Sequence, residues 1–206
     1  IVGHATQLNG PGTYLTHDDT GIPILVTRNR AGEVKAFANV CRHRGARVVN
    51  EACGKANTFA CPYHSWTYDL DGALRGVPQP AGFPELDKSS RGLLELPAFE
   101  RFGLIWVRPE ACEDEIDIDA WLAPMAEQLQ SLDLAAHVIY REWSIATDMS
   151  WRLALEGFQE SYHFCSAHKR TACSTYLDNQ SVFLDQYPHV RHAVPLARIA
   201  DLRDQP

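Results

Sequence analysis

The sequence lacks the features of several large classes of protein. No apolar run approaches the roughly 20 residues that a membrane-spanning helix requires. The first four residues, Ile-Val-Gly-His, have neither the charged start nor the apolar stretch of a signal peptide. Internal repeats and low-complexity segments are also absent. We therefore expect a globular chain with no membrane partner. Because it does not begin with Met, we expect its natural start to lie upstream or to have been processed.

Basic residues are too few for a nucleic-acid-binding protein. The chain has 19 Lys and Arg against 26 Asp and Glu, so its formal net charge is −7. Nucleic-acid binding would require a basic face. With 206 residues, 45% of them hydrophobic, the chain is long enough for one large or two small domains. The composition predicts an ordinary globular protein with no nucleic-acid partner.

Cysteine is sparse and follows no disulfide framework. Of the six cysteines, Cys41 and Cys61 belong to the motifs described next. The other four, Cys53, Cys112, Cys165 and Cys173, have no regular spacing, and a chain of this size does not need disulfides for its stability. This usage favours a reducing cytoplasm, although a disulfide between some pair remains open.

Two short segments each combine one cysteine with one histidine. Residues 41–46 read Cys-Arg-His-Arg-Gly-Ala, and residues 61–66 read Cys-Pro-Tyr-His-Ser-Trp. A Rieske [2Fe–2S] cluster takes two thiolates on one iron and two imidazoles on the other. Gly45 and Pro62 allow the sharp turns that would bring both segments to one cluster. The spacing therefore predicts a Rieske cluster held by Cys41, His43, Cys61 and His64.

A zinc site built from the same four donors is the alternative. Zinc accepts two thiolates with two imidazoles. Its usual ligand segments, however, pair like with like, as C-x₂₋₄-C and H-x₃₋₅-H. Mixed C-x-H and C-x-x-H segments are unusual for zinc, so the iron–sulfur interpretation is favoured.

Short strands separated by turn residues are predicted for residues 1–110. Residues 22–27 and 33–37 read as strands joined by Asn-Arg-Ala-Gly, which is typical of a hairpin turn. Residues 67–74 repeat this pattern around an Asp-Gly turn, and 102–107 are predicted as a buried strand. Residues 76–92 are rich in Pro, Gly and Ser and predict a loop. This half of the chain therefore predicts a small antiparallel sandwich or barrel.

Helical patterns appear only in the second half of the chain. Residues 109–119 are acidic and aperiodic, and we place a domain boundary there, with domains at 1–115 and 116–206. A helix is expected from Asp119, as N-cap, to Leu132, then a strand over 138–147. A second helix is expected over 150–164, with Ser150 as N-cap and with Leu153, Phe158 and Tyr162 on a buried face. The predicted fold class is α+β.

The two cysteine–histidine segments resemble a known family. Residues 39–46 and 61–72 are similar to the Rieske domain of the ring-hydroxylating oxygenase α-subunits. The Rieske proteins of respiratory bc complexes carry an extra Cys in each segment, where this chain has Ala46 and Tyr63. Ser65 is a departure, because the oxygenase family usually has Gly there. The resemblance implies an antiparallel β Rieske domain followed by the beginning of an α+β, helix-grip-like catalytic domain.

A second segment resembles the catalytic motif of the same family, N-W-K-x-x-x-E-N-F-x-E-x-Y-H-x-x-x-x-H. The match comprises Trp151, Glu156, Phe158, Glu160, Tyr162, His163 and His168. The departures are Ser150, Arg152 and Gly157. Alone, a His pair five residues apart is a weak signal, since such residues do not neighbour each other on a regular helix. They could converge if the helix ends between them.

The resemblance implies roles for three of these residues. His163 and His168 would bind a mononuclear Fe(II), as in non-haem oxygenases with two His and one carboxylate. Glu160 would be the bridging carboxylate that connects an iron-ligand His to a Rieske His of a neighbouring subunit. The family usually has Asp here, and a Glu resembles the monooxygenases of quaternary amines more than the aromatic dioxygenases. The family's third iron ligand lies much further along, so none is assigned, and the chain resembles an N-terminal portion of such an enzyme.

The resemblance implies a terminal oxygenase. Electrons from NAD(P)H would arrive through a reductase, directly or by way of a ferredoxin, and O₂ would be used to hydroxylate, dihydroxylate or oxidatively demethylate a small aromatic or quaternary-amine substrate. The expected assembly is a homotrimer or α₃β₃. The alternative is a Rieske-type ferredoxin, an electron carrier without catalytic iron. Residues 120–206 count against that alternative, because a carrier has no need of them.

Overall fold

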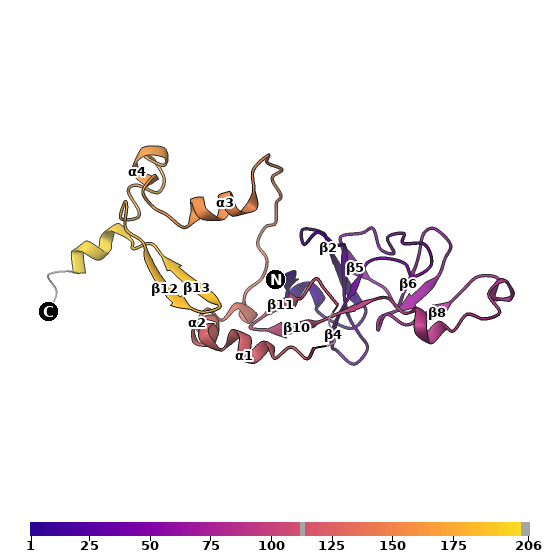
Figure 1. The fold of residues 1–206 in the computed structure, drawn as a ribbon. Coiled ribbons are helices and arrows are strands. Elements are labelled where there is room, and N and C mark those ends of the chain that lie inside the picture. Colours follow the sequence, from indigo (N-terminus) through magenta and orange to yellow (C-terminus); the bar gives the residue numbers. More distant parts are fainter. Residues whose placement is uncertain (112–113, 203–206) are drawn as a thin grey trace. The chain divides into compact units, whose positions relative to one another are not determined.

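The computed structural model describes residues 1–111 and 114–202 (Figure 1). These residues divide into two compact units, one of residues 1–120 and 127–141 and the other of 121–126 and 142–206. The predicted domain boundary near residue 115 stays a prediction, since residues 127–141 group with the first unit. Cys112, one of the six cysteines, lies outside the described residues.

The first unit is built from three antiparallel sheets. Turn chemistry explains its hairpins: Asn29 accepts a hydrogen bond from the backbone N–H of Glu33 at 2.9 Å and so closes the turn between β3 and β4. The five-stranded sheet has the order β5-β2-β3-β4-β9, with strands Cys53–Lys55, Thr13–His17, Ile24–Arg28, Val34–Ala38 and Glu95–Leu96. The other two sheets are β1-β11-β10 (Gly3–His4, Leu104–Val107, Ala98–Arg101) and β6-β7-β8 (Thr58–Ala60, Thr67–Asp69, Leu74–Gly76). The hairpins and the strand near 102–107 that the sequence predicted are confirmed.

Two hydrophobic clusters fill this unit. One packs Ile24, Val26 and Ala36 of the central strands against Leu96 and Ile105, each at most 1% exposed. The other contains the two motif cysteines together with Phe37, Trp66, Tyr68 and Leu70. Both motif cysteines are therefore anchored in the core, although several other residues of the two segments are exposed.

Short helices and 3₁₀ turns follow and connect the strands, and residues 121–126 among them belong to the second unit. Residues 77–92 form the predicted loop, which contains the 3₁₀ turns η2 (Pro80–Gly82) and η3 (Lys88–Arg91); η1 is Ala5–Leu8. After the boundary come α1 (Ile118–Leu122), η4 (Ala123–Met125), α2 (Ala126–Ser131) and η5 (Leu134–Ala136). The predicted helix thus exists but is interrupted at Pro124. Its N-cap is not Asp119: α1 begins at Ile118, and Asp117 accepts the hydrogen bond from the Ala120 N–H at 2.9 Å.

The second unit contains α3 (Trp151–Phe158), α4 (Phe164–Ala167), the hairpin of β12 (Val182–Gln186) and β13 (His189–Ala193), and η6 (Ala197–Leu202) (Figure 1). Ser150 caps α3 as predicted, by accepting from the Arg152 N–H at 3.3 Å. The helix ends at Phe158 and not near 164, and Gly157 in its last turn weakens it there.

Two expectations for the second half of the chain are wrong. Residues 138–147 form no strand, because no neighbouring strand in the described residues supplies the ladder of hydrogen bonds that a strand needs. Leu153, Phe158 and Tyr162 do not form a buried face, since they are 61%, 83% and 73% exposed. Trp143, within the segment 138–147, is 69% exposed. None of the helices in the described residues combines the length and the apolar character needed to span a bilayer.

Candidate iron–sulfur and metal sites

The two motif segments form two separate turns of the same type, with the same pattern of backbone hydrogen bonds. In the first, the Cys41 N–H donates to the Ala46 carbonyl at 2.8 Å, and the Gly45 N–H donates to the Cys41 carbonyl at 3.0 Å. In the second, Cys61 and Trp66 make the first bond at 2.8 Å, and Ser65 and Cys61 make the second at 2.9 Å. Gly45 and Ser65 occupy the same position in each turn, and both are left-handed, with φ of 73° and 57°. The two cysteines therefore hold equivalent positions, whereas His43 is the third residue of its turn and His64 the fourth.

The four predicted cluster ligands come together. Cys41 and Cys61 are free thiols, 4% and 2% exposed. The imidazole rings of His43 and His64 lie with their centroids 4.7 Å apart. His43 Nδ1 is buried and has no hydrogen-bond partner, so this nitrogen is available to a ligand. Two buried thiols and two adjacent imidazoles fit the donor set of a Rieske cluster.

The geometry is less suited to a single zinc ion. A zinc site requires four donors around one point. Among the described residues, no three His, Cys, Asp or Glu side chains are placed to hold one metal ion. A Rieske cluster does not need this, because its thiolates and imidazoles bind different irons. The cluster assignment of these four residues remains a prediction, and their arrangement fits it.

The pKa values of His43 and Cys61 are shifted in opposite directions. Burial, with smaller contributions from His64 and Arg44, lowers the pKa of His43, so its imidazole stays neutral as a metal ligand must. Burial also raises the pKa of the Cys61 thiol, and the neighbouring Cys41 raises it further. A metal that binds Cys61 must therefore displace its proton, which couples cluster binding to proton release.

Tyr68 lies beneath the first segment, where the sequence predicted only packing. Its ring is fully buried, and its hydroxyl contacts Cys41 Sγ at 3.3 Å and accepts the Arg42 N–H at 3.0 Å. Burial, followed by the Cys41 contact, raises the pKa of Tyr68 well above its usual value. The hydroxyl therefore stays protonated and can donate a hydrogen bond to the sulfur when Cys41 is a metal-bound thiolate. The sequence could have indicated only that a buried Tyr needs a hydrogen-bond partner for its O–H, and not that this partner is Cys41.

Asn39 is a second positioning residue, and its role was missed in the sequence. It is fully buried, donates to the Val49 carbonyl at 2.7 Å, and accepts the N–H groups of Val48 and Val49 at 3.1 and 2.9 Å. These bonds fix the chain immediately before and after the first segment. The sequence offered only one indication of this role, namely that Asn39 is a polar residue next to an apolar strand.

Aromatic rings surround the two imidazoles. Trp66 stacks on His43 with centroids 4.8 Å apart and planes 8° apart, and Phe83 meets the edges of both rings. Tyr63 packs against His64 at 3.8 Å and is 60% exposed. His43 is thus shielded, whereas His64 and Tyr63 face solvent.

The predicted residues of the second site also converge. His163 and His168 precede and follow α4, and their ring centroids are 5.1 Å apart. The four-residue helix between them, and not the end of a longer one, brings the rings together. Glu160 Oε1 accepts a hydrogen bond from His163 Nδ1. This contact leaves His163 Nε2 as the nitrogen that would coordinate a metal.

The contact also sets the charge of Glu160. The hydrogen bond from His163 lowers the pKa of Glu160, and the Tyr162 N–H adds to the effect. The carboxylate is therefore ionised at neutral pH, with its side chain 48% exposed. No third ligand is found: among the described residues no group of three donors is placed for one ion, and Asp178 accepts the Cys165 N–H at 3.2 Å. The roles of His163, His168 and Glu160 remain predictions that this geometry fits.

A disulfide joins Cys165 to Cys173, a pairing that the sequence analysis left open. The two Cα atoms lie 4.6 Å apart, within the usual range for a disulfide. The spacing alone could not identify this pair, because the proximity of the two cysteines arises from a turn. Cys53 is free and exposed.

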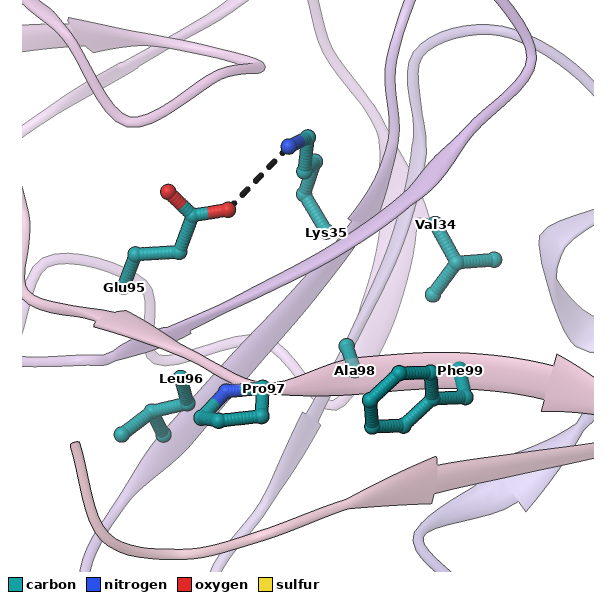
Figure 2. Close-up of a pocket in the computed structure, with 7 residues that line it drawn as sticks. All are labelled: Val34, Lys35, Glu95, Leu96, Pro97, Ala98 and Phe99. Atoms are coloured by element: carbon teal, nitrogen blue, oxygen red, sulfur yellow. Dashed lines mark hydrogen bonds and ion pairs between the residues drawn. The ribbon is translucent and has the colours of Figure 1, made fainter. Parts of the chain in front are cut away.

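An open groove on the first unit lies apart from both predicted ligand sets. It encloses about 360 Å³ where β4, β9 and β10 meet, and the ion pair of Lys35 and Glu95, 3.1 Å apart, crosses it (Figure 2). None of the predicted cluster or iron ligands lines it.

Comparisons with known proteins agree with this arrangement. The family model described as Rieske [2Fe-2S] domain matches residues 1–97. The glycine betaine monooxygenase oxygenase subunit of Chromohalobacter salexigens is 36% identical over 173 residues, which are 82% of this chain and 37% of that protein. The chlorobenzene dioxygenase subunit alpha of a Cupriavidus species is 35% identical over 171 residues, 79% of this chain and 37% of that protein. The chain thus spans well under half the length of these relatives.

The fold is shared with a solved structure. The quaternary ammonium Rieske monooxygenase CntA, in complex with its substrate L-carnitine, superposes with a TM-score of 0.83 at 26% identity. The superposition covers 94% of this chain and 55% of the other. It therefore includes both units described above.

Proposed function

We infer that the chain belongs to the α-subunits of the Rieske oxygenases, and on that premise we propose that it works in a terminal oxygenase. When bound, the [2Fe–2S] cluster supplies single-electron transfer and the mononuclear iron supplies oxygen activation. Cys41 and Cys61 would hold one iron of the cluster, and His43 and His64 the other. His163 and His168 would hold the mononuclear iron.

The observation that carries the proposal is the contact between Glu160 and His163. The carboxylate orients the imidazole through Nδ1 and keeps Nε2 directed to the metal. Its half-exposed side chain can accept a further hydrogen bond from outside the chain. His64 is the more exposed of the two predicted cluster imidazoles. We therefore propose that Glu160 joins His163 to His64 of a neighbouring copy in a trimer.

Substitution of Glu160 tests this role. We expect Glu160→Ala to retain all metals but to lose turnover, because the hydrogen-bonded path between the two sites is broken. Glu160→Asp, which keeps the carboxylate, should retain part of the activity. The measurements are iron and sulfide content, the EPR signal of the reduced cluster, and product formed per O₂ consumed. Normal coupled product formation in Glu160→Ala would remove the bridging role.

Metal content separates the oxygenase from a ferredoxin-like carrier. A carrier would contain two irons per chain and lose none on His163→Ala. The oxygenase should contain a third iron that His163→Ala removes while the reduced-Rieske signal persists. Zinc without sulfide would contradict both.

Quaternary amines are the substrate class we propose first. Two of the similar proteins act on such compounds by name, the glycine betaine monooxygenase subunit and CntA, whereas the chlorobenzene dioxygenase acts on an aromatic one. The glutamate at position 160 points in the same direction. Formaldehyde release from a methylated quaternary amine, measured against ring hydroxylation of an aromatic acid, distinguishes the classes. We propose that a reductase supplies electrons from NAD(P)H, either directly or through a ferredoxin. We propose that the enzyme works in the cytoplasm, with or without β-subunits.

A further inference from the structure

The disulfide of Cys165 and Cys173 lies within the predicted iron-binding segment. Cys165 belongs to α4, which His163 precedes and His168 follows. The sequence separation of eight residues places His168 inside the loop that the disulfide closes. The link therefore joins the helix between the two histidines to the turn that follows the second one.

Hydrogen bonds show that this turn is built on His168. The His168 carbonyl accepts the N–H groups of Thr171, Ala172 and Cys173 at 3.1, 3.1 and 3.2 Å. A helix of four residues has little stability by itself, so tertiary links must hold it. The disulfide is the covalent one among them, and it fixes where His168 stands relative to His163.

The position and exposure of the link argue against a purely stabilising role. Stabilisation by a disulfide grows with the length of the loop that it closes, and this loop is short. Both cysteines are only partly buried, so the disulfide is not enclosed in a core. Accessible disulfides are the labile and regulatory ones.

We propose that Cys165 and Cys173 form a redox-modification site that fixes the His163–His168 pair when oxidised and loosens it when reduced. The proposal rests on the proposed function, because it assigns these histidines to iron. Its reactants are hydrogen peroxide for oxidation and a dithiol protein or compound for reduction.

Both reactions balance. In oxidation the two thiols lose two electrons and two protons, the S–S bond forms, and the O–O bond of hydrogen peroxide breaks to give two waters. In reduction a thiolate of the dithiol attacks one sulfur and forms a mixed disulfide. Its second thiol then resolves this intermediate, which leaves two cysteine thiols and an oxidised reductant.

Thiol mapping on the full chain tests the modification itself. The chain is treated with hydrogen peroxide or with dithiothreitol, desalted, alkylated with iodoacetamide and digested for mass spectrometry. We expect Cys165 and Cys173 to be linked after peroxide and alkylated after dithiothreitol, reversibly. Cys53→Ser should leave this cycle unchanged. Thiols that stay unlinked after peroxide, or a link that dithiothreitol cannot open, would overturn the proposal.

Hydrogen exchange and cobalt binding test the consequence. On reduction, we expect the amides of residues 171–173 to exchange about tenfold faster, because the turn opens more often. We expect the affinity for Co²⁺ to fall about tenfold, because the histidines are no longer pre-organised. The double variant Cys165→Ser/Cys173→Ser should behave as the reduced chain and ignore dithiothreitol. It also excludes Co²⁺ binding by the freed thiols.

His163→Ala separates the two proposals. If this variant binds Co²⁺ as the unaltered chain does, the assignment of the metal site fails. If it loses Co²⁺ binding while the oxidised, reduced and double-serine chains share one affinity and one exchange rate, the redox site alone fails.

Discussion

Ser65 shows how one residue can carry a backbone conformation that glycine would adopt more easily. It occupies the left-handed position of the second turn, with φ of 57°, where the first turn has Gly45. A side chain in this region costs on the order of 1 kcal/mol. The turn keeps its hydrogen bond from the Ser65 N–H to Cys61 at 2.9 Å in spite of this cost.

Ser65→Gly should therefore increase the free energy of unfolding by about 1 kcal/mol. Gly45→Ala is the matched control and should decrease it by a similar amount. A Cβ at Gly45 would meet no atom within 4 Å, so only the backbone conformation contributes. Urea denaturation followed by circular dichroism measures both. A Ser65→Gly chain less stable than the unaltered one would mean that the serine side chain makes a compensating contact.

Tyr68→Phe tests the hydroxyl beneath Cys41. The substitution leaves the partly buried Arg42 N–H without its acceptor, which should cost about 1 kcal/mol of stability. It also removes the donor toward Cys41 Sγ at 3.3 Å, so the reduction potential of a bound cluster should become more negative. Redox titration followed by EPR measures the potential.

Tyr14→Phe serves as the control for Tyr68→Phe. Tyr14 belongs to the same hydrophobic cluster but makes its ring contact with Phe59, at 5.3 Å. Its substitution should leave the potential unchanged. Equal shifts in both variants would show that general loosening of the core, and not the hydroxyl, sets the potential.

At the scale of elements, side-chain hydrogen bonds connect hairpins and helices that are not paired with each other as strands. Asn29, in the β3–β4 turn, donates to Asp71 in the β7–β8 turn at 2.8 Å and so links two sheets. Arg101 of β10 donates to both carboxylate oxygens of Asp119 in α1, at 2.6 and 2.8 Å. Such two-pronged ion pairs are the geometry in which a surface pair contributes to stability.

The pH dependence of stability should reveal the Arg101–Asp119 pair. Its hydrogen bond with Arg101 lowers the pKa of Asp119 in the folded chain below the unfolded value of about 3.9. The stabilisation is therefore present above that unfolded pKa and is lost as the pH falls through the folded one. Asp119→Asn should be less stable than the unaltered chain at neutral pH, and the difference should shrink in strong acid.

A second variant makes that test specific to the pair. Arg101→Gln should show the same loss at neutral pH, and the double variant should lose little more than either single one. Urea denaturation over a pH series gives the three differences. Additive losses, or a difference that does not change with pH, would contradict the coupling.

At the scale of the whole molecule, the second unit exposes apolar side chains on several elements. Trp151 and Phe158 of α3 are 70% and 83% exposed, and Phe183 and Val190 of the β12–β13 hairpin are 53% and 56% exposed. Exposed apolar surface of this extent marks an interaction face. The region matched by this chain is 37% of each of the two relatives.

Mixing two inactive variants tests whether the proposed enzyme works across chains. Cys41→Ser should lack the cluster, and His163→Ala should lack the mononuclear iron. If electrons pass between neighbouring subunits of a ring, co-expression of the two should restore turnover that neither shows alone. The readout is substrate-dependent O₂ consumption, with iron and sulfide content as the control. Mixed assemblies that form but remain inactive would show that each chain uses only its own cluster.

The sequence by itself predicted the donor sets and determined the β-rich first unit. Thiolates and imidazoles in fixed segments limit the chemistry before any fold is known, and turn residues such as Asn29 and Gly32 specify hairpins locally. The same local logic located Ser150 as a helix cap. Glu160 and His163, three residues apart, were also within its reach, because they are neighbours along the chain.

Only the tertiary structure decided what depends on distant neighbours. It placed the Tyr68 hydroxyl against Cys41 and Asn39 against residues 48–49, and it left 138–147 without a strand. It joined Cys165 to Cys173 through a turn that the spacing of the cysteines does not predict. Strand pairing, burial and disulfide formation all require a partner segment, and the partner is fixed by packing of the whole chain, not by local propensity.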